Sequence, residues 1–335
     1  MTKVPERWAA DWGEVRKTAI IADEAGIDFI LPLARWRGYG GDTNPTNSTF
    51  ETFTFAASLS GITEHIKLFS TVHVPFIHPA FAARSASTID HSSNGRFGLN
   101  IVCGWSLNEF ELFGLNNYQI ESRYEHGKEW VEVFERMLSD EEFGHYKGRF
   151  FHLKDAKCRP SSIQRPRPKL MSAAFSLEGR AFATTYCDIL FVIHSNLESA
   201  KDQVKKAKAM FRNNGKDGTV FTLGHVVCRE TNQEAEDYYE NYTENMADVE
   251  AVDNFISDIG VSKPLVPKFF HANRKRVAGG AGSTPLVGSP ARVAEQIVAI
   301  REVGFGGIGL GFVNYLSELP FFIDKALPLI RGKTG

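Results

Sequence analysis

The polar residues that could do chemistry in this chain lie near the ends of successive apolar segments. Asn100 is the most conspicuous of them, because it interrupts an otherwise apolar run from Phe97 to Val102. In α/β proteins the carboxyl ends of parallel strands meet at one edge of the sheet, and that edge carries the active site. We therefore expect these side chains to form one site. The candidates are Arg35, Thr71, His73, Asn100, Glu109 and Ser176.

Each candidate also has a structural interpretation that the sequence leaves open. Asn100 could satisfy the backbone of a loop. His73 stands between Val72 and Val74, where a hydrogen-bonded core histidine is the more common finding. Thr71 has the β-branched side chain that strands favour for packing alone.

Two further positions could hold an anion. Arg123 and Tyr124 lie near the start of a predicted helix over 121–138, where a guanidinium fork and a hydroxyl could bind a phosphate. A surface arginine beside a packed tyrosine is the alternative. Ser176 begins the next predicted helix, whose free N–H groups suit a phosphate. A simple N-cap would explain a serine there equally well.

Two other patterns are set aside. Gly304–Gly309 matches the dinucleotide pattern GxGxxG, but it follows a predicted helix and enters a strand, the reverse of the order that the motif requires. His73 and His78 are separated by Pro75 and have no carboxylate between them, so we expect no metal site.

Composition narrows the class of protein. The chain has 335 residues, 43% of them hydrophobic, and a formal net charge of −2, so it has no basic field for nucleic acid. No apolar run is long enough to cross a bilayer, so we expect no membrane partner. The four scattered cysteines form no zinc pattern, and we expect reduced thiols in a cytoplasmic protein.

The elements that must position these residues alternate between strands and helices. This order predicts an α/β fold with right-handed crossovers and a parallel sheet, in a single domain spanning 1–335. Insertions are expected at about 143–168, beginning with a hairpin, and at about 248–285. The seven predicted strands cover 27–33, 66–74, 96–102, 169–174, 189–193, 220–227 and 307–313.

A TIM (β/α)8 barrel has eight strands, so one is missing or irregular. We place the missing strand before the first helix, which is predicted over 14–25. Either Met1–Trp12 supplies an irregular substitute, or the chain begins downstream of that strand; we favour the second.

Several motifs resemble one family. The segment Ser87–Trp105 resembles the helix end, turn and strand that mark the bacterial luciferase-like, flavin-dependent monooxygenases. Arg37–Gly41, Arg123-Tyr124 and Leu286–Ala291 are similar to the branch with pyrimidine and dimethyl sulfone monooxygenases, alkanesulfonate monooxygenases being more distant. The similarity covers nearly the whole chain.

The resemblance implies a TIM barrel that binds reduced FMN delivered by a separate NAD(P)H-dependent flavin reductase, with O2 as co-substrate. It places Thr71 and Asn100 in the pocket where oxygen meets the flavin, as hydrogen-bond donors, and we group His73 with them as catalytic. His73 and Phe76 stand where relatives vary, so we expect both to face substrate, with aromatic walls from Trp36, Tyr39 and Phe175. The implied FMN contacts are Ala34, Arg35, Asn100, Glu109, Arg123, Tyr124 and Ser176.

We therefore predict a two-component monooxygenase that oxidises a small organic molecule, with C–N cleavage of a heterocyclic amide as the expected reaction. Cleavage of C–S in a sulfone or sulfonate is the nearest alternative. Hydride transfer with a deazaflavin, coenzyme F420, is another, and a non-catalytic flavin-storage protein is a third. The resemblance makes a homodimer or homotetramer the expected assembly.

Overall fold

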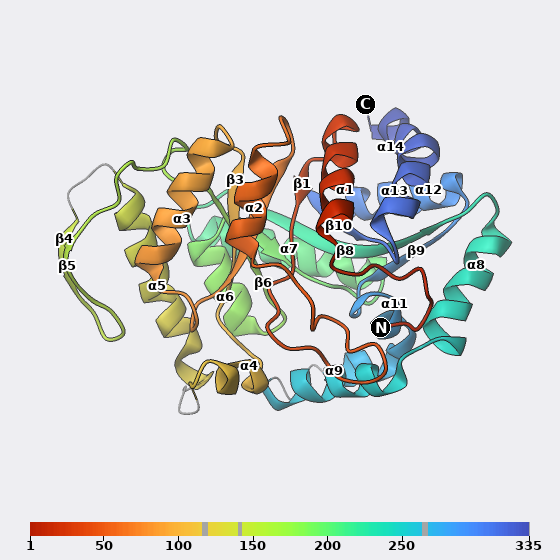
Figure 1. Ribbon diagram of the computed structural model, residues 1–335, viewed down its shortest axis with the longest axis horizontal. Coiled ribbons are helices and arrows are strands. Elements are labelled where there is room, and N and C mark those ends of the chain that lie inside the picture. Colours follow the sequence, from red (N-terminus) through yellow and green to blue (C-terminus); the bar gives the residue numbers. More distant parts are fainter. Residues whose placement is uncertain (116–119, 140–142, 263–266, 335) are drawn as a thin grey trace. The chain divides into compact units, whose positions relative to one another are not determined.

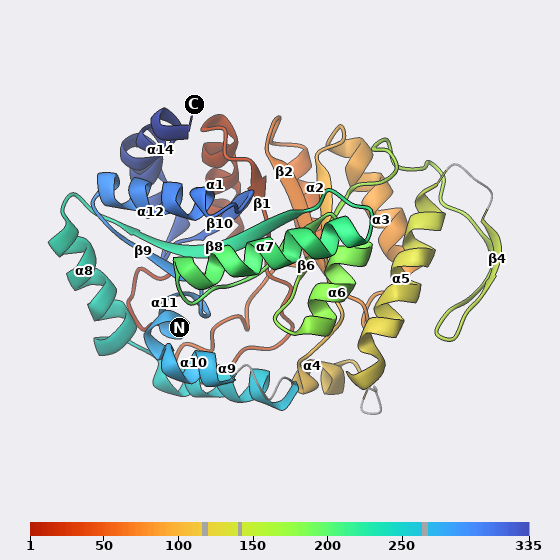
Figure 2. The same cartoon turned by 180° about the vertical axis from the view of Figure 1, so that it is seen from behind.

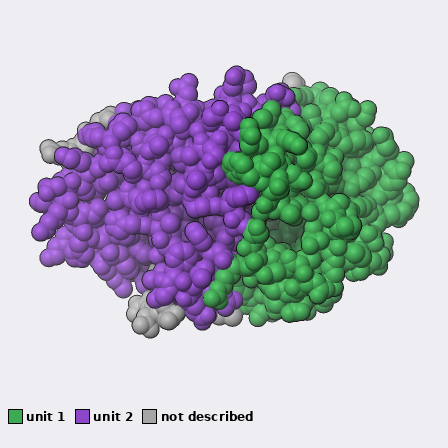
Figure 3. All heavy atoms as spheres, in the orientation of Figure 1, with its two compact units in different colours: residues 1–21, 37–48, 191–335 green, residues 22–36, 49–190 purple. Residues whose placement is uncertain are grey.

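The computed structural model describes residues 1–115, 120–139, 143–262 and 267–334 (Figure 1). Its contacts divide the chain into two compact units (Figure 3). Unit 1 comprises residues 1–21, 37–48 and 191–335, and unit 2 comprises residues 22–36 and 49–190. Helix α1, Trp12–Glu24, contributes to both.

The strands of unit 2 form a parallel arrangement in which the apolar side chains are buried. β1 pairs with β2, β2 with β3, and β3 with β6, all in parallel. Leu68, Leu99 and Leu170 from three of them are at most 1% exposed. The strands are β1 (Phe29–Ile30), β2 (Lys67–His73), β3 (Phe97–Val102), β6 (Lys169–Ala173) and the first two residues of β7 (Ile189–Phe191).

Helices connect these strands in chain order, and Trp130 and Phe134 of α5 stack in the core with ring centroids 5.2 Å apart. The predicted hairpin is confirmed as antiparallel β4 (Gly144–Lys147) and β5 (His152–Ala156). The unit 2 helices are α2 (Thr52–Ser60), α3 (Pro79–Ser92), α4 (Leu107–Leu112), the 3-10 turn η1 (Ile120–Ser122), α5 (Arg123–Leu138) and α6 (Leu177–Tyr186).

Unit 1 is built on β8 (Thr219–Cys228), which pairs in parallel with β9 (Thr284–Gly288) and with β10 (Gly307–Gly311). Helix α7 packs on β8, and α12 packs on α14 (Figure 2). The helices are α7 (Leu197–Asn213), α8 (Asn232–Glu240), α9 (Val249–Ser262), α10 (Pro267–Ala272), α11 (Arg274–Gly280), α12 (Pro290–Glu302), α13 (Tyr315–Phe321) and α14 (Leu327–Thr334), with π-helical turns η2 (Asn241–Asn245) and η3 (Phe322–Ala326).

Strand β9 corrects the predicted strand count. The sequence pattern places Thr284–Gly288 partly in the insertion at 248–285, because Pro285 and the preceding glycines favour a loop. Within the described residues β9 pairs only with β8, and an edge strand tolerates a proline that lacks an N–H. Residues 263–266 of that insertion lie outside the described residues.

The N-terminal part of the chain also has features that the sequence does not predict. β1 is two residues long, because Pro32 cannot donate to a ladder. Helix α2 begins at Thr52 with Glu51 as its N-cap. Before α1 the N-terminal segment forms a single antiparallel bridge, between Thr2 and Ala247, and the Trp8 N–H donates to the Val313 carbonyl over 2.7 Å.

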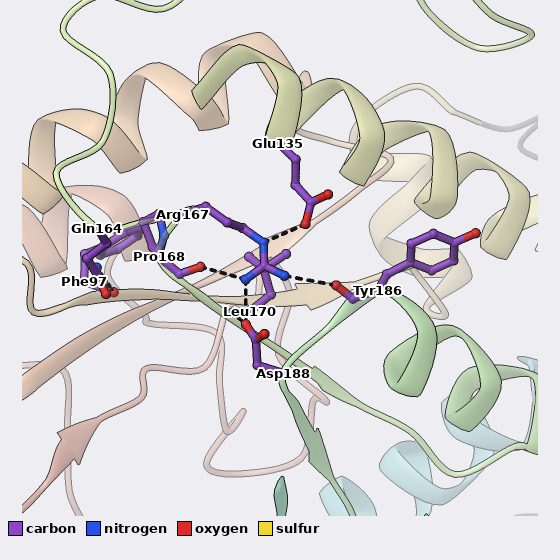
Figure 4. A network of polar contacts seen from close by, with 8 residues as sticks. All are labelled: Phe97, Glu135, Gln164, Arg167, Pro168, Leu170, Tyr186 and Asp188. Carbon is purple, nitrogen blue, oxygen red and sulfur yellow. Dashed lines mark hydrogen bonds and ion pairs between the residues drawn. The ribbon is translucent and has the colours of Figure 1, made fainter. Parts of the chain in front are cut away.

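A buried arginine ties the starts of β6 and β7 to α5 in unit 2 (Figure 4). The Arg167 side chain is 8% exposed and donates over 2.6 Å to both Glu135 of α5 and Asp188. It also donates to the carbonyls of Pro168 and Tyr186. The second Asp188 contact, from the Leu170 N–H at 2.8 Å, completes the network.

The resemblance motif contributes two similar anchors. Arg96 donates to the carbonyls of Ser60, Thr63 and Ile66, which closes the turn before β2. Asp90 is fully buried and accepts from Ser162 Oγ and from backbone N–H groups of the loop over 163–164. Both motif residues therefore hold backbone in place.

Candidate functional site

Thr71 and Asn100 face one another where β2 and β3 approach their carboxyl ends. They are register partners on the two strands, and each is 8% exposed. The Asn100 Nδ2 donates to Thr71 Oγ1 over 3.2 Å, and Thr71 Oγ1 donates to the Pro32 carbonyl over 2.8 Å. The structure therefore joins these two predicted residues through one chain of hydrogen bonds.

The direction of this chain fixes what Asn100 presents. A threonine hydroxyl has one proton, and that of Thr71 is donated to Pro32. Thr71 must then accept from the amide nitrogen of Asn100, which leaves Asn100 Oδ1 as a buried acceptor that has no hydrogen-bond partner. The sequence predicts both residues as donors. Because the Thr71 proton is donated to Pro32, the pair offers the Asn100 amide oxygen as an acceptor and one remaining amide N–H as a donor.

His73 lies two residues beyond Thr71 on the same strand and is 5% exposed. Its Nδ1 is buried without a hydrogen-bond partner. Burial, with the Arg35 guanidinium as a second cause, lowers the pKa of His73 to about 3. The imidazole is therefore neutral at physiological pH and offers one donor and one acceptor.

The predicted contacts Arg35 and Glu109 pair with each other. Arg35 Nε lies 3.3 Å from Glu109 Oε1, and the two side chains are 8% and 2% exposed. Glu109 also accepts from the Trp36 N–H over 2.9 Å, and the Arg35 guanidinium lies over the Trp105 ring at 4.7 Å. Each buried charge is thus balanced by its neighbour.

Aromatic rings gather beside these residues in unit 2. Phe76 stacks on Phe113 with centroids 4.2 Å apart, and Trp36 meets Phe113 edge-on at 5.0 Å. His73 lies 5.4 Å from Phe76. The sequence predicts Trp36 and Phe76 as substrate walls but misses Phe113, which follows a short helix and shows no pattern of its own.

A pocket opens beside the ends of β1 and β2 and the start of α2. It contains the predicted Ala34, Arg35, Trp36, Thr71 and His73. Sequence reasoning missed the rest, because their types suit helix caps and cores: Thr49, Phe50, Glu51, Thr52, Phe53, Val72 and Ile77.

The residues predicted to bind an anion lie near one another within unit 2. Tyr124 Oη lies 3.2 Å from Ser176 Oγ, and the Arg123 guanidinium lies 4.9 Å from the centre of the Tyr124 ring. Ser176 is the N-cap of α6 and accepts from the Gly179 N–H. A Cβ at Gly179 would lie 2.7 Å from Tyr124 Oη, so only glycine leaves room for this hydroxyl.

The remaining two predicted aromatic walls are Tyr39 and Phe175. Tyr39 belongs to unit 1, where it is buried against Phe255 at 5.1 Å and its carbonyl accepts from Asn254. Phe175 is half-buried beside Ser176.

Two features are absent from the described residues. These residues contain no group of three or more histidine, cysteine or acidic side chains arranged to hold a metal ion. Nor does any helix among them have the length and apolar character needed to span a membrane.

Comparisons with known proteins identify similar chains and similar folds. A pyrimidine monooxygenase of Methylorubrum extorquens is 33% identical over 95% of this chain and 87% of the relative. An FMNH2-dependent dimethylsulfone monooxygenase of Pseudomonas putida is 28% identical over 99% of this chain and 91% of the relative. A riboflavin lyase solved with modified FMN and riboflavin superposes with a TM-score of 0.86, at 20% identity, over 98% of this chain and 87% of that one.

The family model described as luciferase-like monooxygenase matches residues 2–307. The predicted family, the luciferase-like α/β fold and the monooxygenase class are thereby confirmed. The chain belongs to the luciferase-like monooxygenase family.

Proposed function

We propose that this protein is the oxygenase component of a two-component system, in which reduced FMN from a separate NAD(P)H-dependent reductase and O2 oxidise a small organic molecule. The observation that carries the proposal is the Thr71–Asn100 pair with its buried amide oxygen, together with neutral His73 two residues further along β2. The proposed reaction is C–N cleavage of a heterocyclic amide. The relatives that are named as pyrimidine monooxygenases support this choice.

The residues present fit reduced FMN. Asn100 Oδ1 is a buried acceptor without a donor, and a reduced flavin carries ring N–H groups that could supply one. Arg123, Tyr124 and Ser176 combine a guanidinium, two hydroxyls and the start of a ten-residue helix. This is the set of groups that binds a phosphate.

When bound, reduced FMN supplies the electrons that activate O2. The protein's own residues would then orient and protect the reacting groups. Asn100 would accept one hydrogen bond, and neutral His73 would offer a donor or an acceptor to the substrate. The aromatic cluster of Trp36, Phe76 and Phe113 would exclude water.

The test combines the purified chain with a flavin reductase, NADH, FMN and 18O2. Uracil, dimethyl sulfone and methanesulfonate serve as candidate substrates, and mass spectrometry follows label incorporation. We expect one labelled oxygen atom in a ring-opened product of uracil. Turnover of a sulfone with none of any heterocyclic amide would overturn C–N cleavage. If the protein binds reduced deazaflavin tightly but does not bind reduced FMN, the proposal that FMN is the cofactor is wrong.

Two properties of the whole assembly belong to the same proposal. We expect the protein to work in the cytoplasm as a homodimer or homotetramer. Light scattering of the purified chain at micromolar concentration measures the assembly, and a monomer would contradict it.

A further inference from the structure

The pocket beside α2 has a charge balance that constrains what can enter it. Arg35 is its single cationic side chain among the described lining residues. That charge is already matched by Glu109, because the two groups lie 3.3 Å apart and are both buried. His73, the other basic side chain of the lining, is neutral at physiological pH. No positive charge is therefore left over for an anionic substrate.

Glu51 adds a negative charge to the same lining. Its carboxylate caps α2 by accepting from the Phe53 N–H over 2.9 Å and from the Thr54 N–H over 2.7 Å. Serine, threonine, asparagine and aspartate are the usual residues at this position. A neutral serine would cap the helix as well, so capping alone does not call for a charged side chain.

The position of Glu51 matters because a helix N-terminus is otherwise a binding site for anions. Here α2 begins at the pocket, and Thr52 and Phe53 are part of the lining. The Glu51 carboxylate occupies the first N–H groups that a sulfonate or carboxylate would need. It therefore both removes the donors and repels the anion.

We infer that Glu51 is a specificity-determining residue that makes the pocket accept uncharged molecules and exclude organic anions. The identity of the pocket as the substrate site rests on the proposed function, whereas the exclusion of anions does not. The pocket would then admit uncharged heterocyclic amides and sulfones and exclude sulfonates. The Glu51 side chain would determine this difference.

The first test needs no substrate, because Trp36 lies in the same lining and is 38% exposed. Iodide, acrylamide and caesium are an anionic, a neutral and a cationic quencher of tryptophan fluorescence. The signal of Trp36 is obtained as the difference between the parent and Trp36→Phe, at constant low ionic strength. In Glu51→Ser, which keeps a capping side chain, we expect the ratio of iodide to acrylamide quenching to rise about two- to fivefold. Caesium quenching should fall.

Asp11→Ser is the matched control. Asp11 also caps a helix, by accepting from the Glu14 N–H over 2.8 Å, and it is not part of the pocket lining. Its removal should leave the quenching ratio of Trp36 unchanged. An iodide-to-acrylamide ratio in Glu51→Ser equal to that in Asp11→Ser overturns the inference, whatever the enzyme oxidises.

The second test uses matched ligands with the reductase-coupled enzyme. Uracil is compared with its carboxylated analogue orotate, and dimethyl sulfone with methanesulfonate, each as substrate or as competitive inhibitor. The parent should discriminate against the anion in each pair, and Glu51→Ser should reduce this discrimination about three- to tenfold at low ionic strength. If the parent oxidises the anion as efficiently as its neutral partner, the exclusion of anions is contradicted, whereas the proposed monooxygenase function still stands. If no flavin-dependent oxidation occurs at all, the proposed function fails, and the quenching experiment still decides the inference.

Discussion

The buried polar groups at the two ends of the unit 2 strands differ in whether they have hydrogen-bond partners. At the amino ends, Arg96 and Arg167 each donate to several backbone carbonyls, and Arg167 also pairs with two carboxylates. At the carboxyl ends, Asn100 Oδ1 and His73 Nδ1 are buried without hydrogen-bond partners. Arg96 and Asn100 are only four residues apart, so a single strand region contains both conditions.

The groups with partners stabilise the fold, whereas the groups without partners are available to bind a ligand. A buried polar atom without a partner costs on the order of 1–3 kcal/mol, so such an atom calls for an explanation, and binding of a ligand is one. Barrel enzymes place stability at the amino ends and catalysis at the carboxyl ends of their strands. Mutations at the two ends should therefore affect different properties.

The largest expected effect is on turnover, at the carboxyl ends. Asn100→Ala removes the amide that faces the proposed flavin site. We expect kcat/KM for the best substrate to fall about 100- to 1,000-fold, since loss of one oriented polar group in an active site has that effect. The urea midpoint should stay constant or rise, because a buried atom without a partner is removed. If the kcat/KM of Asn100→Ala stays within threefold of the parent value, the role in turnover assigned to the carboxyl ends is contradicted.

Arg167→Ala should produce the reverse. Its removal leaves Asp188 and Glu135 without their cation, which should lower the free energy of unfolding by about 3 kcal/mol, as measured by urea denaturation. The kcat per folded molecule should not change. Arg149→Ala is the control, because the pair between Arg149 and Glu125 is exposed and such pairs contribute about 1 kcal/mol or less. Equal losses in the two variants would contradict the assigned role of Arg167.

His73 predicts a pH dependence. Its pKa falls from 6.5 in the unfolded chain to about 3 in the folded protein, so the unfolded chain binds the proton first and stability is lost as pH falls from about 6.5 towards 3. Between pH 7.5 and 5.5 the parent should lose about 1.4 kcal/mol more than His73→Phe. Urea denaturation at both pH values measures this, with His152→Phe at an exposed position as control. An identical pH dependence in His73→Phe and the parent would show that His73 is not buried neutral.

The smallest effect concerns the anion site. Tyr124→Phe removes the hydroxyl that contacts Ser176, and loss of one hydrogen bond to a phosphate should weaken binding of reduced FMN about five- to tenfold. Anaerobic titration followed by fluorescence gives the dissociation constant. Tyr186→Phe, on the same helix as Gly179, should leave it unchanged. If the two variants change the dissociation constant of reduced FMN equally, Tyr124 is not part of the proposed phosphate site.

The sequence predicts most of the fold because the strands and helices alternate with strong periodicity. The sequence predicts β2 and β3 to within a residue or two, since each is an apolar run bounded by turn residues. It does not predict the whole of β9, because a proline and nearby glycines obscure the pattern of a short edge strand.

The sequence predicts which residues form the candidate site, but it does not predict the directions of the hydrogen bonds between them. Strand ends placed Thr71, His73 and Asn100 near one another. Which atom donates to which depends on Pro32, a backbone carbonyl that carries no signal in the sequence. The same holds for Phe113, which reaches Phe76 only through tertiary packing.

The hydrogen bonds from Asn100 to Thr71 and on to Pro32 form a chain with a fixed polarity. A carbonyl oxygen can only accept, so the chain cannot run backwards, and the amide of Asn100 cannot flip without breaking it. The amide dipole is consequently oriented once, when the protein folds. It does not have to reorient at each catalytic cycle, and for this reason a small neutral group can be effective in electrostatic preorganisation.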